Sequence, residues 1–227
     1  MQFMRITKTP QFLFLFLLIC SNIYANEMVE ELPKKSERYP GYIITLVDEK
    51  IDGEVIVGSI TDREAKIQFI ADGTEKKKSY KAKQLNGYGF ESIEEDDLGL
   101  EYKRWIHFEQ QNVDYPPKPF ASTTVFMQKE ENGALVLYTY YMEVRNDRKN
   151  PFKYFYYIKN DKGDLVKVEK KDFRKVAGKL FKNYSAMYAK IGRKDFQYKN
   201  LDRMVRDYNY WSTNQHNANE YRVALKQ

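Results

Sequence analysis

Hydrophobic and polar residues alternate along most of residues 41–168, with the period of two that is typical of β-strands. Turn-forming pairs such as Asp72-Gly73 and Asn132-Gly133 interrupt the alternation. The pattern therefore predicts a series of antiparallel hairpins. The expected strands are Tyr42–Val47, Val55–Ile60, Ala65–Ile70, Ser79–Ala82, Leu85–Phe90, Tyr102–Glu109, Ala121–Gln128, Leu135–Val144, Phe152–Ile158 and Leu165–Val168.

Three segments between these strands are expected to be turns or loops. Asp48–Gly53 ends in an Asp-Gly pair and is predicted to form the turn between the first two strands. The acidic segment Glu91–Gly99 is predicted to be a loop. Residues 115–119 contain three prolines, which fix φ and restrict the residue before each of them. They predict a rigid connector between one set of hairpins at 41–109 and a second set at 121–168.

After residue 170 the apolar positions follow the helical period of about 3.6. Asp172 is placed to cap a first helix, Ser185–Ile191 is expected to form a short second one, and Leu201–Tyr208 repeats the apolar stripe after Asn200. The first stripe consists of Phe173, Val176, Ala177, Leu180, Phe181 and Tyr184.

Each of these helical stripes needs an apolar partner, and the preceding sheet is the nearest one. The sequence therefore predicts an α+β protein. An antiparallel β-rich body, built from two successive sets of hairpins, is followed by two or three C-terminal helices within residues 172–211 that pack on the sheet. Residues 212–227 are polar and are expected to form a frayed tail.

The first 25 residues have the three-part pattern of a secretory signal peptide. Arg5 and Lys8 precede the apolar run Phe12–Cys20, and cleavage is expected between Ala25 and Asn26. The run is shorter than the roughly 20 residues that a transmembrane helix needs. Residues 26–40 contain little to bury and predict a flexible leader before a single α+β domain at residues 41–211. We therefore expect an exported protein that is periplasmic, associated with the outer membrane, or secreted.

The only cysteine of the chain, Cys20, lies within the apolar run of the signal. The exported chain is therefore expected to contain no disulfide. Lipid attachment at Cys20 is an alternative, because Leu17–Cys20 is similar to a lipobox, but Ile19 is large for the position before such a cysteine. A membrane contact is expected only through an uncleaved signal or a lipid at Cys20.

Lysines and acidic residues are interspersed along the chain, which has a formal net charge of +6. This distribution is typical of a solvated surface and argues against a nucleic-acid partner. Lys76-Lys77-Lys78 forms a tight basic run, which the flank of a hairpin explains. The 19 tyrosines favour a strand-rich fold, because aromatic side chains suit a pleated and half-buried surface.

The segments GYIIT at residues 41–45, GEVIVGSI at 53–60 and LNGYGF at 85–90 resemble an uncharacterised family of exported proteins that is common in the Bacteroidetes. The likeness continues weakly through Gly133–Tyr138 and Leu201–Asn209. The resemblance implies export and a β-rich body with terminal helices. It implies no particular activity.

The sequence contains few residues from which a reactive centre could be built. Beyond the leader there is no cysteine, and no Gly-x-Ser-x-Gly motif accompanies the two histidines, His107 and His216, so a serine or cysteine hydrolase is disfavoured. His107 is expected to be a half-exposed strand residue, opposite Ile106 and Phe108. Two distant histidines cannot complete a zinc site, and the consecutive carboxylates Glu94–Asp97 favour a solvated loop over a calcium site. We expect neither a metal nor another cofactor.

The aromatic strands Leu135–Val144 and Phe152–Ile158 provide the best candidate binding surface. We expect one sheet face to pack on the helices and the other to present Tyr141, Phe155 and Tyr157 to a glycan or to another envelope protein. The sequence therefore favours a non-enzymatic binding protein. Two alternatives stay open. One is an acid-base hydrolase of cell-wall or extracellular polymers, whose carboxylate pair the spacing does not identify. The other is a tethered or outer-membrane-associated accessory subunit whose helices dock on a partner.

Overall fold

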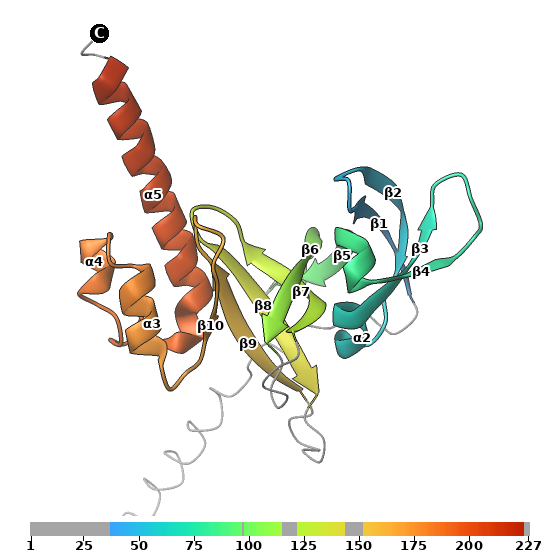
Figure 1. The fold of residues 1–227 in the computed structure, drawn as a ribbon, viewed down its shortest axis with the longest axis horizontal. Coiled ribbons are helices and arrows are strands. Elements are labelled where there is room, and N and C mark those ends of the chain that lie inside the picture. Colours follow the sequence, from blue (N-terminus) through green and yellow to red (C-terminus); the bar gives the residue numbers. More distant parts are fainter. Residues whose placement is uncertain (1–36, 97, 115–121, 144–151, 225–227) are drawn as a thin grey trace, which may run out of the picture. The chain divides into compact units, whose positions relative to one another are not determined.

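Ten strands form one sheet in the computed structural model, in the order β10-β9-β8-β7-β6-β5-β1-β2-β3-β4 (Figure 1). Every neighbouring pair is antiparallel. The structure describes residues 37–96, 98–114, 122–143 and 152–224. The strands are β1 Arg38–Thr45, β2 Lys50–Ile56, β3 Lys66–Ala71, β4 Lys78–Lys81, β5 Leu85–Glu95, β6 Glu101–Asp114, β7 Ser122–Glu131, β8 Val136–Glu143, β9 Phe152–Lys159 and β10 Leu165–Val168. The helices are α2 Ile60–Ala65, α3 Phe173–Leu180, α4 Ser185–Tyr188 and α5 Leu201–Ala224, with 3₁₀ turns at Ala82–Gln84 and Tyr198–Asn200.

This architecture confirms the predicted fold class, an antiparallel β-rich sheet followed by C-terminal helices. The predicted signal with Cys20 and its cleavage site lies outside the described residues, as do the connector at 115–119 and most of the leader. The sheet begins at Arg38, so the last three residues of the expected leader belong to β1.

One face of the sheet carries the two largest apolar clusters. Directly paired residues form a row across this face from β1 to β10. The row consists of Ile43, Tyr88, Phe108, Gln128, Thr139, Tyr156 and Val168. We call this the helix-covered face, because α3 packs against β10 and α5 packs against β7 and β8. The cluster at β1–β7 consists of Ile43, Val55, Val57, Ile67, Phe69, Ala82, Leu85, Tyr88, Phe90, Ile106, Phe108 and Phe126.

The C-terminal helices bury their apolar stripes on the same face. Phe173 and Ala177 of α3 and Met187 of α4 join one cluster with Leu137 and Ile158 of the sheet. Four residues of α5 also belong to it: Leu201, Met204, Val205 and Tyr208. The predicted helical stripes are therefore the ones that the sheet buries, and all three helices contribute.

Helix α5 is tied to the start of β8 by one buried amide. Asn209 Nδ2 donates to the carbonyl oxygen of Leu135, and the backbone N–H of Leu135 donates to Asn209 Oδ1, both at 2.8 Å. The side chain thus satisfies both backbone groups of Leu135, as a neighbouring strand would. A side chain at Gly133 would place its Cβ 2.6 Å from Asn209 Cγ, so this glycine is required for the close approach.

The predicted turn at Asp48–Gly53 is wrong, because Gly53 lies within β2 and the chain turns between β1 and β2 at Leu46–Glu49. Asp48 adopts the left-handed conformation at φ 60°, which aspartate tolerates better than most residues. Gly53 serves instead for packing: a Cβ there would lie 2.1 Å from the carbonyl oxygen of Ile70. A glycine that permits a close backbone approach has the same sequence signature as a turn glycine.

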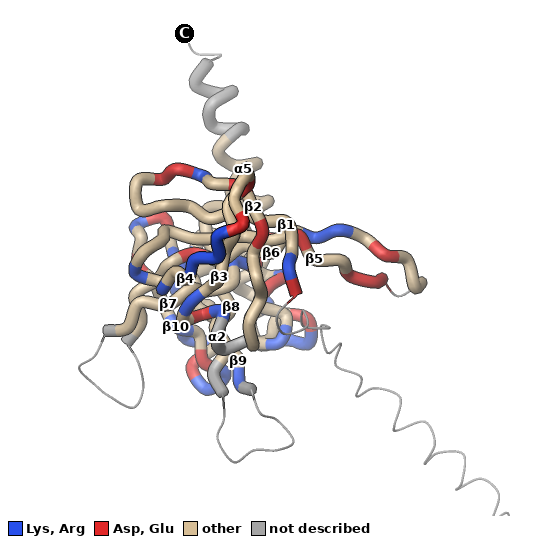
Figure 2. Tube along the Cα trace, turned by 90° about the vertical axis from the view of Figure 1, so that its right-hand side faces the viewer, with Lys and Arg blue, Asp and Glu red and all other residues tan. Residues whose placement is uncertain are grey.

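The ends of two other elements also differ from the prediction. Strand β5 runs to Glu95, so the first half of the predicted loop Glu91–Gly99 is in the sheet (Figure 2 shows acidic residues along this hairpin). Helix α5 continues to Ala224, where a frayed tail from Ser212 was expected. Its last turns lack an apolar stripe, and helix propagation from a nucleated segment needs no such signal.

Helix α2 was not predicted, and it follows β2 where the second expected strand should have ended. Tyr88 in the core stacks on Phe108 at a centroid distance of 4.6 Å, and its hydroxyl donates to the carbonyl oxygen of Arg63 at 2.9 Å. Arg63 and Glu64 are both buried. The hydroxyl of a core tyrosine therefore fixes the C-terminal end of this short helix.

Replacing Asn209 with alanine is expected to lower the free energy of unfolding by about 2–4 kcal/mol, because the N–H and C=O of Leu135 both lose their partner in a buried place. Urea unfolding followed by circular dichroism measures the change. Asn214→Ala, at an exposed position of the same helix, is the control and should be close to neutral. Equal stabilities of the two variants would contradict the bridging role of Asn209.

Candidate functional site

The three predicted binding residues do not share one face of the sheet. The register of β8 and β9 pairs Tyr140 with Phe155 and Tyr141 with Tyr154. Directly opposed residues lie on the same face, and neighbours along a strand lie on opposite faces. Tyr141 therefore lies on the helix-covered face, whereas Phe155 and Tyr157 lie on the other face. The prediction of one surface formed by these three residues is wrong.

Phe155 and Tyr157 take part in packing on the face opposite the helices. Tyr157 is 7% exposed and belongs to a cluster with Tyr138 and Met127, against which Phe155 is partly buried. The ammonium group of Lys167 lies 4.1 Å from the centroid of the Phe155 ring. Neither aromatic ring forms an open binding platform.

Four tyrosines on the helix-covered face form a continuous row, which we call the tyrosine ladder. It consists of Tyr141, Tyr154, Tyr156 and Tyr198. The ring centroids are 6.4 Å apart from Tyr141 to Tyr154, 5.4 Å from Tyr154 to Tyr156, and 5.4 Å from Tyr156 to Tyr198. The row ends on Phe173 at the start of α3, 6.2 Å from Tyr198.

Exposure changes along the tyrosine ladder. Tyr154 is 47% exposed, whereas the other three are half-buried. Burial raises the pKa of Tyr156, and the nearby Tyr154 and Asp202 raise it further. Burial also raises the pKa of Tyr198. The hydroxyl groups of Tyr156 and Tyr198 therefore stay protonated and can donate as well as accept hydrogen bonds.

Tyr154 and Tyr156 were not among the predicted binding residues. They lie on the helix-covered face, and Tyr154 is 47% exposed there, so the helices leave part of this face open. Tyr198 lies in a 3₁₀ turn between α4 and α5, where the sequence predicted no element. No sequence signal relates it to β9, because the contact depends on how the C-terminal helices return to the sheet.

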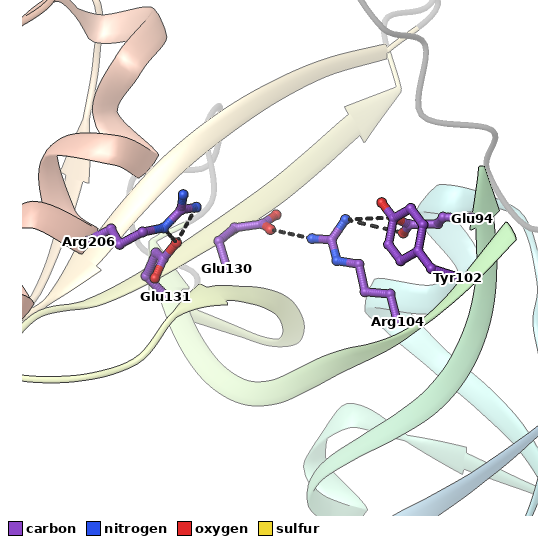
Figure 3. A network of polar contacts seen from close by, with 6 residues as sticks. All are labelled: Glu94, Tyr102, Arg104, Glu130, Glu131 and Arg206. Atoms are coloured by element: carbon purple, nitrogen blue, oxygen red, sulfur yellow. Dashed lines mark hydrogen bonds and ion pairs between the residues drawn. The ribbon is translucent and has the colours of Figure 1, made fainter. Parts of the chain in front are cut away.

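Ion pairs lie beside the ladder. Glu130 at the end of β7 contributes to the raised pKa of Tyr156, and it pairs with Arg104 at 3.5 Å. Arg104 also pairs with Glu94 at 3.2 Å, and Glu94 accepts a hydrogen bond from the Tyr102 hydroxyl at 2.7 Å (Figure 3). These residues connect the hairpin of β5 and β6 to β7.

A second ion pair links β7 to the helices. Arg206 of α5 binds Glu131, with its Nη2 at 2.6 Å and its Nε at 2.7 Å from the same carboxylate oxygen (Figure 3). Glu130 and Glu131 are neighbours at a bulge of β7, so they reach in two directions, toward β6 and toward α5. Glu130 and Glu131 are therefore each bound by an arginine, which argues against their use as an acid-base pair.

Glu64 of α2 holds the start of the ladder in place. The backbone N–H of Tyr141 donates a hydrogen bond to Glu64 Oε1. Thr139 is the last residue of β8 that pairs with β7, so Tyr141 lies beyond the part of β8 that β7 covers. Burial raises the pKa of the Glu64 carboxyl group to about 9, although the hydrogen bond from Tyr141 and the charge of Arg63 act to lower it. The buried carboxyl group is therefore protonated at neutral pH.

The other face of the sheet carries a second polar cluster around His107. As expected, His107 is half-buried, and its side chain lies on the strand face opposite that of Ile106 and Phe108. Its Nδ1 is 2.6 Å from the Tyr42 hydroxyl oxygen. Burial lowers the pKa of His107. Glu109 is held at 2.5 Å by both Lys129 and Tyr138, and these two hydrogen bonds outweigh the effect of burial and lower its pKa. Each polar group is thus engaged within the sheet.

Within residues 37–96, 98–114, 122–143 and 152–224, no group of three or more histidine, cysteine or acidic residues is arranged to hold a metal ion. In the same residues, none of the helices combines the length and the apolar character needed to cross a bilayer. Comparisons with protein-family models, curated proteins and solved structures gave no match to this chain. Function is therefore inferred from the residues of the chain itself.

The raised pKa of Glu64 predicts a pH-dependent stability. The unfolded chain releases this proton near pH 4.5 and the folded protein near pH 9, so the stabilisation is complete below pH 4.5 and falls as the pH rises through this window. One proton corresponds to a slope of about 1.4 kcal/mol per pH unit. Glu64→Gln keeps an acceptor for Tyr141 but cannot ionise, so its free energy of unfolding should fall less steeply and exceed that of the wild type at pH 8.

Urea unfolding at pH 5, 6.5 and 8 measures these slopes. Glu75→Gln is the matched control, because Glu75 is exposed in the loop between β3 and β4. Its slope should equal that of the wild type. A Glu64→Gln variant that retained the slope of the wild type would show that the carboxyl group is ionised in the folded protein.

Proposed function

We propose that this chain is a non-enzymatic binding protein of the cell envelope, and that it binds a glycan on the tyrosine ladder. The row of four tyrosines, in which Tyr154 is 47% exposed, is the observation that supports this proposal. The signal-like pattern of residues 1–25 and the resemblance to exported Bacteroidetes proteins support the export that this proposal includes.

The chemistry of the ladder suits a sugar better than an apolar ligand. A tyrosine ring provides a flat surface for the C–H face of a pyranose, and its hydroxyl provides a hydrogen bond while remaining compatible with water. Successive rings 5.4–6.4 Å apart offer adjacent contacts for neighbouring sugar units. Glu130 and Arg104 beside the row add polar groups of the kind that orient a ligand.

The carboxylates near the ladder favour binding over hydrolysis. A glycosidase needs one carboxyl group with a raised pKa and a second carboxylate facing it across the substrate. Glu130 and Glu131 are each paired with an arginine, and Glu64 is buried against the backbone of Tyr141. A carbohydrate-binding role is therefore the interpretation that these contacts support best.

Replacement of Tyr154 by alanine is expected to weaken glycan binding about tenfold, which corresponds to the loss of one aromatic contact. Affinity gel electrophoresis with a soluble β-glucan, an α-glucan and a mannan measures retardation of the folded protein. Tyr188→Ala is the control, because Tyr188 is 53% exposed on α4 but does not belong to the ladder. Tyr154→Phe, which keeps the ring, should retain most of the binding.

The outcome against the proposal is equally specific. If no polysaccharide retards the wild type, or if Tyr188→Ala weakens binding as much as Tyr154→Ala, the tyrosine ladder is not a glycan site. Unchanged circular dichroism spectra are required of each variant, so that a loss of binding reports the surface and not the fold.

Export has an independent test. Mass spectrometry of the protein isolated from a fractionated producer cell is expected to give Asn26 as the first residue, in the envelope or extracellular fraction. A chain that begins with a lipid-modified Cys20 would indicate lipoprotein processing instead. An intact Met1 on cytosolic protein would contradict export.

A further inference from the structure

The segment between β10 and α5 is strongly basic. Residues 170–199 contain ten lysine and arginine residues and only two aspartates. The whole chain has 38 basic and 32 acidic residues, so all of the positive excess comes from this segment and the rest of the chain holds more acids than bases. All ten basic side chains are exposed: Lys170, Lys171, Arg174, Lys175, Lys179, Lys182, Lys190, Arg193, Lys194 and Lys199. We call these ten residues the basic surface.

Helix α3 arranges part of the basic surface into a stripe. Lys175 and Lys179 are four residues apart in α3; Lys171 precedes the helix at the same interval, and Lys182 follows just after it. Side chains with this spacing lie on the same face of a helix. Phe173 and Ala177, on the other side of α3, are buried against the sheet. The helix is thus amphipathic, with its apolar side in the core and its lysines in solvent.

The loop after α4 extends the basic surface beside this stripe. A side chain at Gly192 would place its Cβ 2.4 Å from Nε of Arg174, so the guanidinium group lies directly against this loop. Arg193 and Lys194 follow Gly192, and Lys190 lies 5.4 Å from the centroid of the Phe196 ring. The cations of α3 and of the loop therefore belong to one surface.

Few carboxylates neutralise these charges. Glu169 pairs with Lys171 at 2.8 Å and with Lys167 at 2.9 Å. The hydrogen bond from Lys171, followed by that from Lys167, lowers the pKa of Glu169 to about 2. Among the described residues, Lys175, Lys179 and Lys182 take part in no ion pair. An open hollow of about 430 Å³ lies beside this stripe, lined by Lys167, Glu169, Asp172, Lys175, Val176 and Lys179.

We propose that the basic surface docks on a membrane that is rich in anionic phospholipids. A lysine near such a membrane contributes on the order of 1 kcal/mol of attraction, so several together produce stable but salt-sensitive binding. Eight of the ten cations are lysines, which act as hydrated point charges. The exposed Tyr188 lies within the same segment, 3.7 Å from a Cβ position on Gly178 of α3, and tyrosine is common at membrane interfaces.

A lipid surface fits these features better than a nucleic acid or another anionic polymer. Recognition of a phosphate along a polymer typically uses arginine forks or aromatic stacking within a groove. Here arginines are few, and the aromatic residues Phe173 and Phe181 are buried in the core, where they cannot stack on a ligand. The acidic hairpin of β5 and β6 is separated from β10 by three strands, so the unlike charges are segregated along the sheet. This segregation would orient the protein on a negatively charged plane. The proposal is independent of the tyrosine ladder.

Co-sedimentation with vesicles tests the proposal, using the protein as it is processed during export. Vesicles of phosphatidylglycerol and phosphatidylcholine at 30:70, and vesicles of phosphatidylcholine alone, are compared at low and at high salt. The wild type is expected to bind the anionic vesicles at least tenfold more strongly, and the difference should shrink at high salt. A retained signal or lipid would bind both kinds of vesicle alike and does not affect this ratio.

Three variants then locate the binding surface. Lys175→Gln, Lys179→Gln and Lys182→Gln combined should reduce binding to anionic vesicles about tenfold or more, because three cations leave the stripe. The combined control Lys76→Gln, Lys77→Gln and Lys78→Gln removes the same charge from exposed positions near β4 and should bind like the wild type. Replacing the three stripe lysines with arginine keeps the positive charge and should preserve binding. This variant shows whether the loss in the glutamine variant comes from the missing charge or from a disturbed fold.

Two results would overturn the proposal. An equal loss in the stripe variant and in the control would indicate a general effect of net charge. Binding of heparin or of a DNA duplex that requires the three stripe lysines, without binding of anionic vesicles, would assign the basic surface to a polymer in place of a membrane.

Discussion

The hydrogen bonds between β8 and β9 place Tyr141 opposite Tyr154 and Thr139 opposite Tyr156, and the composition of both sheet faces depends on that register. A shift by one residue would move every side chain of a strand to the other face. The observed register brings three tyrosines to the face that the helices partly cover, where Tyr198 joins them. It also leaves Phe155 and Tyr157 on the other face, where they pack with Met127 and Tyr138. Register therefore determines which aromatic residues are available to a ligand.

Polar side chains secure the places where helices meet this sheet. Asn209 binds both backbone groups of Leu135, Glu64 binds the backbone of Tyr141, and the Tyr88 hydroxyl binds the backbone of Arg63. Each contact provides a partner for a backbone group away from water, where a missing partner would be costly. Apolar burial supplies the attraction between the layers, and these directional contacts fix how the layers are positioned. The tyrosine ladder depends on two of them, because α2 supports β8 and α5 follows the turn that carries Tyr198.

The proposed surfaces use different chemistry on the same C-terminal part of the chain. The tyrosine ladder consists of uncharged aromatic side chains, and burial raises the pKa of Tyr156 and Tyr198. The basic surface on α3 and the following loop is charged, lysine-rich and exposed. A protein that is held at a membrane by one surface and binds a glycan with the other would act at the boundary of the cell. The two activities can be separated experimentally, because no residue belongs to both surfaces.

The sequence by itself determined the class of fold, because the change in apolar period from two to 3.6 near residue 170 is a local property. It also determined most strands of the second half, the apolar stripe of α3, and the orientation of His107. Only the tertiary structure decided what depends on contacts between distant residues. These include the use of Gly53 for a close backbone approach and the contact of Tyr198 with Tyr156. They also include the placement of Tyr141 on one sheet face and of Phe155 and Tyr157 on the other. The reason is physical: alternation along a strand defines two faces, but pairing with other strands and packing of the helices decide which residues share a face and which remain exposed.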